Sequence, residues 1–79
     1  MKTVRKVPIT MRALTQRINR KLAEDDEQLK KAGSAKSRQE VGDYFIINVR
    51  LNAVVRLDVD PEALGHKLGV LREWESVQE

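Results

Sequence analysis

The sequence contains no cysteine, and this absence excludes both a disulfide framework and a thiolate metal site. Aromatic residues make up only 4% of the 79 residues, so one Phe, one Tyr and one Trp supply all the large rings. A chain this short buries only about 60% of its unfolded surface, and its core is therefore thin. Packing, hydrogen bonding or association with another chain has to supply the stability that disulfides give other small proteins.

Long apolar runs are also missing. No run of about 18 apolar residues is present that could cross a membrane, and residues 1–9 lack the apolar stretch of a signal peptide. The 41% hydrophobic and 34% charged residues are typical of a globular chain. We therefore expect a single cytoplasmic domain over residues 1–79 that does not bind membranes.

Reactive side chains are scarce. His66 is the only histidine and has no second His or Cys with which to hold a metal. Residues 58–62 begin like a calcium loop, but Ala63 and Gly69 stand where that loop needs Gly and Glu. The four glycines are scattered and form no phosphate-binding loop. We predict that the chain is not an enzyme and has no catalytic residues, metal or cofactor.

Positive charge is concentrated at one end of the chain, whose net charge is +3. The first 22 residues hold seven cations and no acid, whereas residues 43–79 hold seven acids against four cations. A segment of this kind attracts phosphates. It predicts a nucleic-acid-binding surface formed by Arg5, Lys6, Arg12, Arg17, Arg20 and Lys21. A merely solvated face and contact with an acidic protein stay open as alternatives.

Apolar spacing predicts a long helix over residues 11–31. Thr10 is suited to cap its start, and Gly33 to stop it. Its stripe at helical spacing consists of Met11, Leu14, Ile18, Leu22, Leu29 and Ala32. Asp25 falls on this stripe, so the helix has to leave the core, bend or end near that residue. Residues 34–42 have no periodicity and are predicted to form a mobile connection.

Residues 44–49 and 53–59 are rich in β-branched and aromatic side chains and predict an antiparallel hairpin. A three-residue loop that ends at left-handed Asn52 favours a register in which one set of residues faces the helix. That set is Phe45, Ile47, Val49, Val55 and Leu57. Residues 1–9 form either a basic arm or a third, edge strand.

A short second helix is predicted after Asp60, because Asp60 can cap it and Pro61 suits its first position. Gly69 ends this helix, and residues 76–79 form a frayed tail. The expected fold is an α+β domain of α-β-β-α order. The long N-terminal helix packs on the hairpin, and the short C-terminal helix closes the same core.

The other face of the hairpin carries Tyr44, Ile46 and Val54 and is more apolar than a solvated face usually is. This predicts a protein interface on that face and a homodimer, because a two-stranded sheet is marginal by itself. Trp74 has two interpretations. It is either an interface anchor or part of the core, and the shortage of aromatic residues favours the core.

Three segments carry a resemblance: residues 11–23, the run Gly-Asp-Tyr-Phe-Ile at 42–46, and Leu-Gly-Val-Leu at 68–71 followed by Trp74 and Glu75. They resemble short proteins of unassigned function encoded on bacterial genomes and mobile elements. The resemblance implies a bacterial or phage origin and brings no active site. Two functions stay open: a nucleic-acid-binding accessory protein that uses the basic third, and a protein-interaction module that acts as a small regulator or inhibitor.

Overall fold

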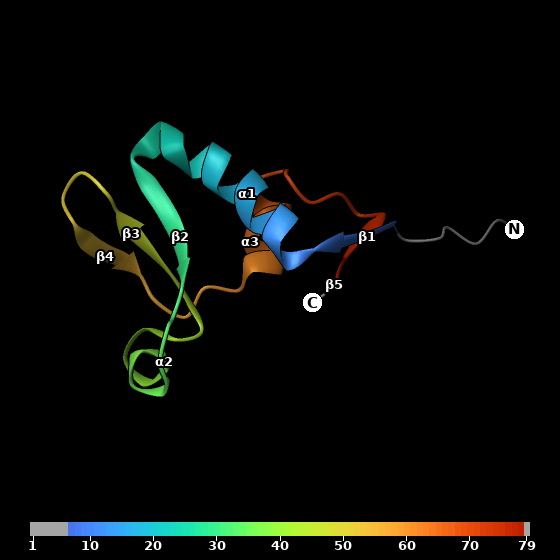
Figure 1. Cartoon of the computed structure of the whole chain (residues 1–79). Helices are drawn as coiled ribbons and strands as arrows, with labels where there is room; N and C mark the ends of the chain where they lie inside the picture. Colours follow the sequence, from blue (N-terminus) through green and yellow to red (C-terminus); the bar gives the residue numbers. More distant parts are fainter. Residues whose placement is uncertain (1–6, 79) are drawn as a thin grey trace, which may run out of the picture.

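The computed structural model describes residues 7–78. Over this range the chain forms an α+β domain with the element order β1 (Val7–Thr10), α1 (Met11–Leu22), η1 (Ala23–Asp25), β2 (Glu27–Lys31), α2 (Ala35–Val41), β3 (Tyr44–Asn48), β4 (Ala53–Arg56), α3 (Pro61–Lys67) and β5 (Glu75–Gln78). Strands β2, β3 and β4 form an antiparallel sheet, and β1 pairs in parallel with β5. Figure 1 shows the β1–β5 pair beside the start of α1 and the three-stranded sheet toward its end.

The first helix begins as the sequence predicts but ends nine residues earlier. The hydroxyl of Thr10 accepts a hydrogen bond of 3.0 Å from the amide of Ala13, which confirms the cap. A 3₁₀ turn follows Leu22, and Asp26 then takes a left-handed conformation with φ of 60°. The prediction of helix over residues 23–31 is therefore wrong, because the chain reverses and continues as β2.

Leu29 explains why the helical pattern misled. It is 3% exposed, as the predicted helix requires, but it reaches the core from β2, opposite Ile46 of β3. Its amide donates a 2.7 Å hydrogen bond to the side-chain oxygen of Asn19 on α1. The spacing of Leu29 fits a continued helix, but it also fits a strand that folds back and packs on the helix. Periodicity alone therefore does not distinguish the helix from the strand.

The hairpin is confirmed, but its register is shifted. Asn48 pairs with Ala53 and Ile47 with Val54, whereas the predicted register set Val49 against Ala53. The side chain of Asn48 accepts hydrogen bonds of 3.0 and 2.8 Å from the amides of Arg50 and Leu51, which ends β3 one residue early. Asn52 does take the expected left-handed conformation, with φ of 53°.

In β3 the face that is buried in the core is the opposite of the predicted one. Ile46 lies in the core at 3% exposure, and half-buried Tyr44 packs against the core cluster. The predicted inward set is wrong for three residues, since Val49, Val55 and Leu57 are about half exposed. A register irregularity between Ile46 and Ile47 brings the pairing back to the predicted register, since Ile46 pairs with Arg56.

Residues 34–42, predicted to be a mobile connection, contain helix α2. The hydroxyl of Ser34 caps this helix by accepting a 3.1 Å hydrogen bond from the amide of Ser37. The run of Ser, Lys, Arg and Gln concealed the helix because it has no apolar periodicity. None of the residues of α2 is buried, so the helix contributes little to the core.

Helix α3 follows the prediction at both ends. Asp60 accepts from the amides of Glu62 and Ala63, and Pro61 occupies the first position. After the helix Gly69 has a φ of 75°. The amides of Gly69 and Val70 bond to the carbonyls of His66 and Gly65, which is the Schellman arrangement.

The two ends of the chain meet in the β1–β5 pair. The expected third strand of the hairpin is supplied by β2, whereas β1 lies beside β5. Residues 76–78, expected to fray, belong to β5 and pair with residues 8–10 of β1. The expected α-β-β-α order is thus replaced by a longer sequence of elements.

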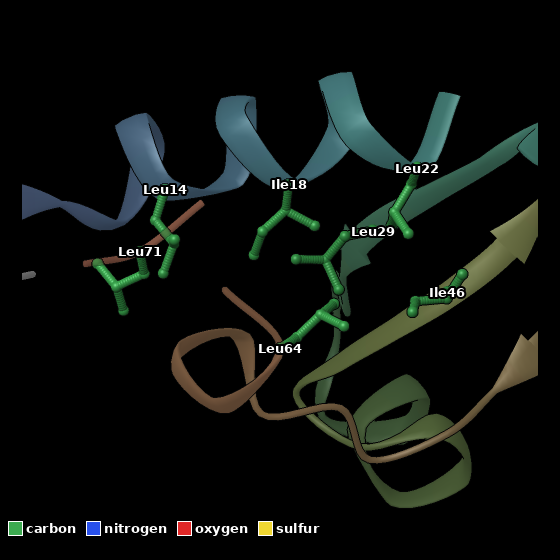
Figure 2. Packing of buried hydrophobic residues seen from close by; sticks show 7 residues of the cluster. All are labelled: Leu14, Ile18, Leu22, Leu29, Ile46, Leu64 and Leu71. Atoms are coloured by element: carbon green, nitrogen blue, oxygen red, sulfur yellow. The ribbon is translucent and has the colours of Figure 1, made fainter. Parts of the chain in front are cut away.

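The core is formed on one side of α1. Leu14 and Ile18 are fully buried, and the helix contacts elements on both sides of the domain. A Cβ at Gly65 would lie 2.8 Å from Cδ1 of Leu14, so α3 approaches α1 closely because this residue is glycine. Figure 2 shows the cluster between α1, the sheet and α3: Leu14, Ile18, Leu22, Leu29, Ile46, Leu64 and Leu71.

Substitutions in the hairpin test its two faces. Ile46→Ala removes buried atoms and should lower the free energy of unfolding by about 2–5 kcal/mol. Val54→Ala, on the exposed side, should change it by less than about 1 kcal/mol. Urea unfolding followed by circular dichroism measures both values. A small effect at both positions would instead support the faces predicted from the sequence, in which Ile46 and Val54 both point away from the helix.

Candidate functional site

The strongest polar contact of the described residues joins α1 to the start of β5. One guanidinium nitrogen of Arg17, Nη1, lies 2.9 and 3.0 Å from the two carboxylate oxygens of Glu75. The same nitrogen donates to the carbonyl of Val70 at 3.1 Å, and the amide of Arg72 donates to Glu75 at 2.9 Å. The Glu75 side chain is 10% exposed and that of Arg17 is 40% exposed. Arg17 therefore has a structural role and also reaches the surface.

The hydrogen bond from Arg17, with a smaller contribution from the amide of Arg72, lowers the pKa of Glu75 below its ordinary value of 4.5. Partial burial of the carboxyl opposes this change but does not outweigh it. Glu75 is therefore an anion at neutral pH. The largely buried Glu75 carboxylate therefore compensates the positive charge of Arg17.

Above this ion pair lies a shallow, open concavity of about 470 Å³. Its lining residues include three arginines, Arg17, Arg20 and Arg72, together with Trp74. The guanidinium carbon of Arg72 is 5.9 Å from the centroid of the Trp74 ring, within the range of a cation–π contact. We call these four residues the arginine–tryptophan surface.

The structure separates the cations that the sequence groups together. Arg17 and Arg20 belong to the arginine–tryptophan surface, but Arg12 lies on another flank of α1, in a groove lined also by Lys30 and Lys31. Lys21 forms an ion pair of 3.6 Å with Glu24. The other two predicted residues, Arg5 and Lys6, lie outside the described residues.

The residues predicted for a protein interface are also separated. The prediction that Tyr44 and Ile46 lie on the outer face is wrong, because both face the core. Val54 is 47% exposed and stays available on β4. Trp74 is 51% exposed, so the preference for a core position is wrong and its ring lies at the surface.

Arg72 is the residue of this surface that sequence reasoning missed. It lies within the mildly acidic region of residues 43–79, far from the basic third, so charge clustering along the chain did not point to it. Arg72 and Trp74 belong to one turn, closed by a 3.0 Å hydrogen bond from the amide of Glu75 to the carbonyl of Arg72, and such a turn has no periodic pattern in the sequence. Only the pairing of β5 with β1 brings these residues beside α1.

Other kinds of site find no support in residues 7–78. No three His, Asp or Glu side chains of this range come together as metal ligands. No helix of the described part is long and apolar enough to cross a membrane. Comparisons of the chain with protein families, with curated proteins and with solved structures found no match.

The low pKa of Glu75 predicts how the stability changes with pH. The Arg17 contact favours the carboxylate, so its stabilisation is complete above pH 4.5 and is lost as the pH falls through the lower pKa of the folded state. Glu75→Gln should therefore be less stable than the parent protein at neutral pH, and the difference should shrink in acid. Urea unfolding across this pH range measures the difference.

Glu73→Gln is the matched control, because Glu73 is an exposed acid of the same turn. The free energy of unfolding of Glu73→Gln should differ little from that of the parent protein at every pH. A deficit of Glu75→Gln that stays constant down to roughly pH 3 would contradict the assigned ion pair.

Proposed function

We propose that this chain is a non-enzymatic, nucleic-acid-binding accessory protein that uses the arginine–tryptophan surface. The observation that carries the proposal is the grouping of three arginines around one concavity. Guanidinium groups bind phosphate oxygens in a two-pronged geometry, and arginine is the preferred residue for this contact.

The charge balance of this surface supports an anionic ligand. Glu75 is the one acid in its lining and already accepts hydrogen bonds from Arg17 and Arg72. Arg20 is exposed, and the side chain of Arg72 is exposed beside Trp74. The charge of Arg20 thus faces solvent, and the charge of Arg72 makes only the smallest of the contributions that lower the pKa of Glu75.

Salt dependence is the first test. Each phosphate contact contributes a slope of about −0.9 to a plot of log affinity against log salt, so two contacts predict a slope of about −2. Fluorescence anisotropy of a labelled oligonucleotide, measured between roughly 50 and 200 mM salt, gives this value. Absence of binding even at low salt would refute the proposal.

Charge reversal locates the contact. Arg20→Glu and Arg72→Glu should each weaken binding by about tenfold and reduce the salt slope by about 1. The Arg72 substitution keeps the backbone amide that donates a hydrogen bond to Glu75. Lys36→Glu is the matched control, because Lys36 is exposed on α2, away from the β1–β5 pair in Figure 1. Equal losses for all three variants would show general electrostatics and no defined surface.

A second function is favoured by a different observation, the exposed apolar hairpin. Its exposed residues are Val49, Leu51, Val54, Val55 and Leu57. The edge of β2 is partly covered because Asn19 binds the amide of Leu29, whereas all four residues of β4 are exposed. An open strand edge with apolar side chains is suited to pair with another chain. We propose a protein partner or a homodimer as the alternative, in keeping with a small regulator or inhibitor.

Val54→Asp tests this alternative. The residue is half exposed, so the variant should stay folded by circular dichroism but lose any self-association seen by light scattering. Lys36→Glu again serves as the control. If the parent protein is monomeric at high concentration and Val54→Asp scatters light in the same way, the homodimer is refuted. A different protein partner would then be the form of this alternative that stands.

A further inference from the structure

Trp74 is held in place by its backbone while its ring is left at the surface. Leu71 before it is buried at 3% exposure, and the Glu75 side chain after it is bound by Arg17. The amide of Glu75 donates to the carbonyl of Arg72 at 3.0 Å, and the amide of Val7 donates to the carbonyl of Trp74 at 2.6 Å. The turn is thus anchored on both sides, which presents the ring without a large entropy cost on binding.

The exposed ring and the cations share one concavity. Arg72 lies against the ring, and Arg17 and Arg20 line the same space of about 470 Å³. Such a volume is within the range of about 300–1,000 Å³ that is usual for small-molecule sites. An aromatic face for stacking beside cations for a phosphate matches the two parts of a nucleotide unit.

We propose that Trp74 is a stacking platform for an unpaired base, so that the preferred ligand is single-stranded nucleic acid; this inference rests on the proposed function. In a duplex both faces of each base are covered by neighbouring base pairs, and a side chain at the surface cannot stack on them. An unpaired base offers a free face, and aromatic side chains stack on it whatever its sequence.

An acidic protein partner would use the arginines but would have no need of a stacked ring. The contribution of Trp74 to affinity therefore separates the two kinds of ligand. Trp74 is also the only tryptophan of the chain, so its fluorescence reports on this one position.

The experiment compares three ligands of equal length: a single strand, a duplex, and an abasic strand that has the phosphates but no bases. The single strand, tested as DNA and as RNA, should quench the Trp74 fluorescence and bind at least about tenfold more tightly than the abasic strand. The duplex should bind mainly through charge and leave the fluorescence nearly unchanged.

Variants separate stacking from charge. Trp74→Leu should lower the affinity for the single strand by about tenfold or more and keep the salt slope, whereas Trp74→Phe should retain most of the affinity. Arg20→Glu should instead reduce the slope. Circular dichroism checks that each variant is folded. If Trp74→Leu does not fold, the abasic comparison on the unaltered protein decides the question.

Two failures are distinguishable. Salt-dependent binding with no preference for the single strand over the abasic strand, or with no effect of Trp74→Leu in a folded variant, overturns the stacking inference and leaves the proposed function standing. No binding of any of the ligands at low salt removes both. Binding of an acidic polypeptide such as polyglutamate as tightly as the single strand would assign the surface to a protein partner.

Discussion

Burial of one stripe of α1 is the constraint on which the rest of this small domain depends. On one side of α1, Leu14, Ile18 and Leu22 pack in one cluster with Leu64 and Leu71 and with Leu29 and Ile46 of the three-stranded sheet (Figure 2). Because the chain has so few aromatic residues, these aliphatic contacts supply most of the close packing that a stable interior needs. The helix is therefore the common partner of elements that otherwise have little contact with one another.

The same stripe decides which charges meet at the surface. Once Leu14 and Ile18 face the core, Arg17 is turned toward β5, Arg12 toward β2, and Arg20 toward solvent. Glu75 then holds Arg17 and binds the turn that carries Arg72. The proposed binding surface is thus a consequence of how the core is packed, since a rotation of α1 would separate its arginines from Trp74.

Local signals in the sequence predicted element ends well. The caps at Thr10 and Asp60 and the left-handed Gly69 depend on bonds between neighbouring residues, and all are confirmed. Signals that depend on distant partners were less reliable. Leu29 fits a helical stripe and a strand equally well, and which face of β3 is buried depends on how the sheet packs against α1 and α3. Of the candidate surface, Arg17, Arg20 and Trp74 were each noted from the sequence, but not as one group.

By itself the sequence determined the α+β class, the start of α1, both ends of α3 and the presence of the hairpin, because these follow from residues close together in the chain. Only the tertiary structure decided that residues 27–31 form a strand, which face of the hairpin is buried, and that Trp74 lies beside Arg17 and Arg20. Those outcomes depend on pairing between residues distant in the chain, above all β1 with β5, and no local pattern records which distant partner a strand will find.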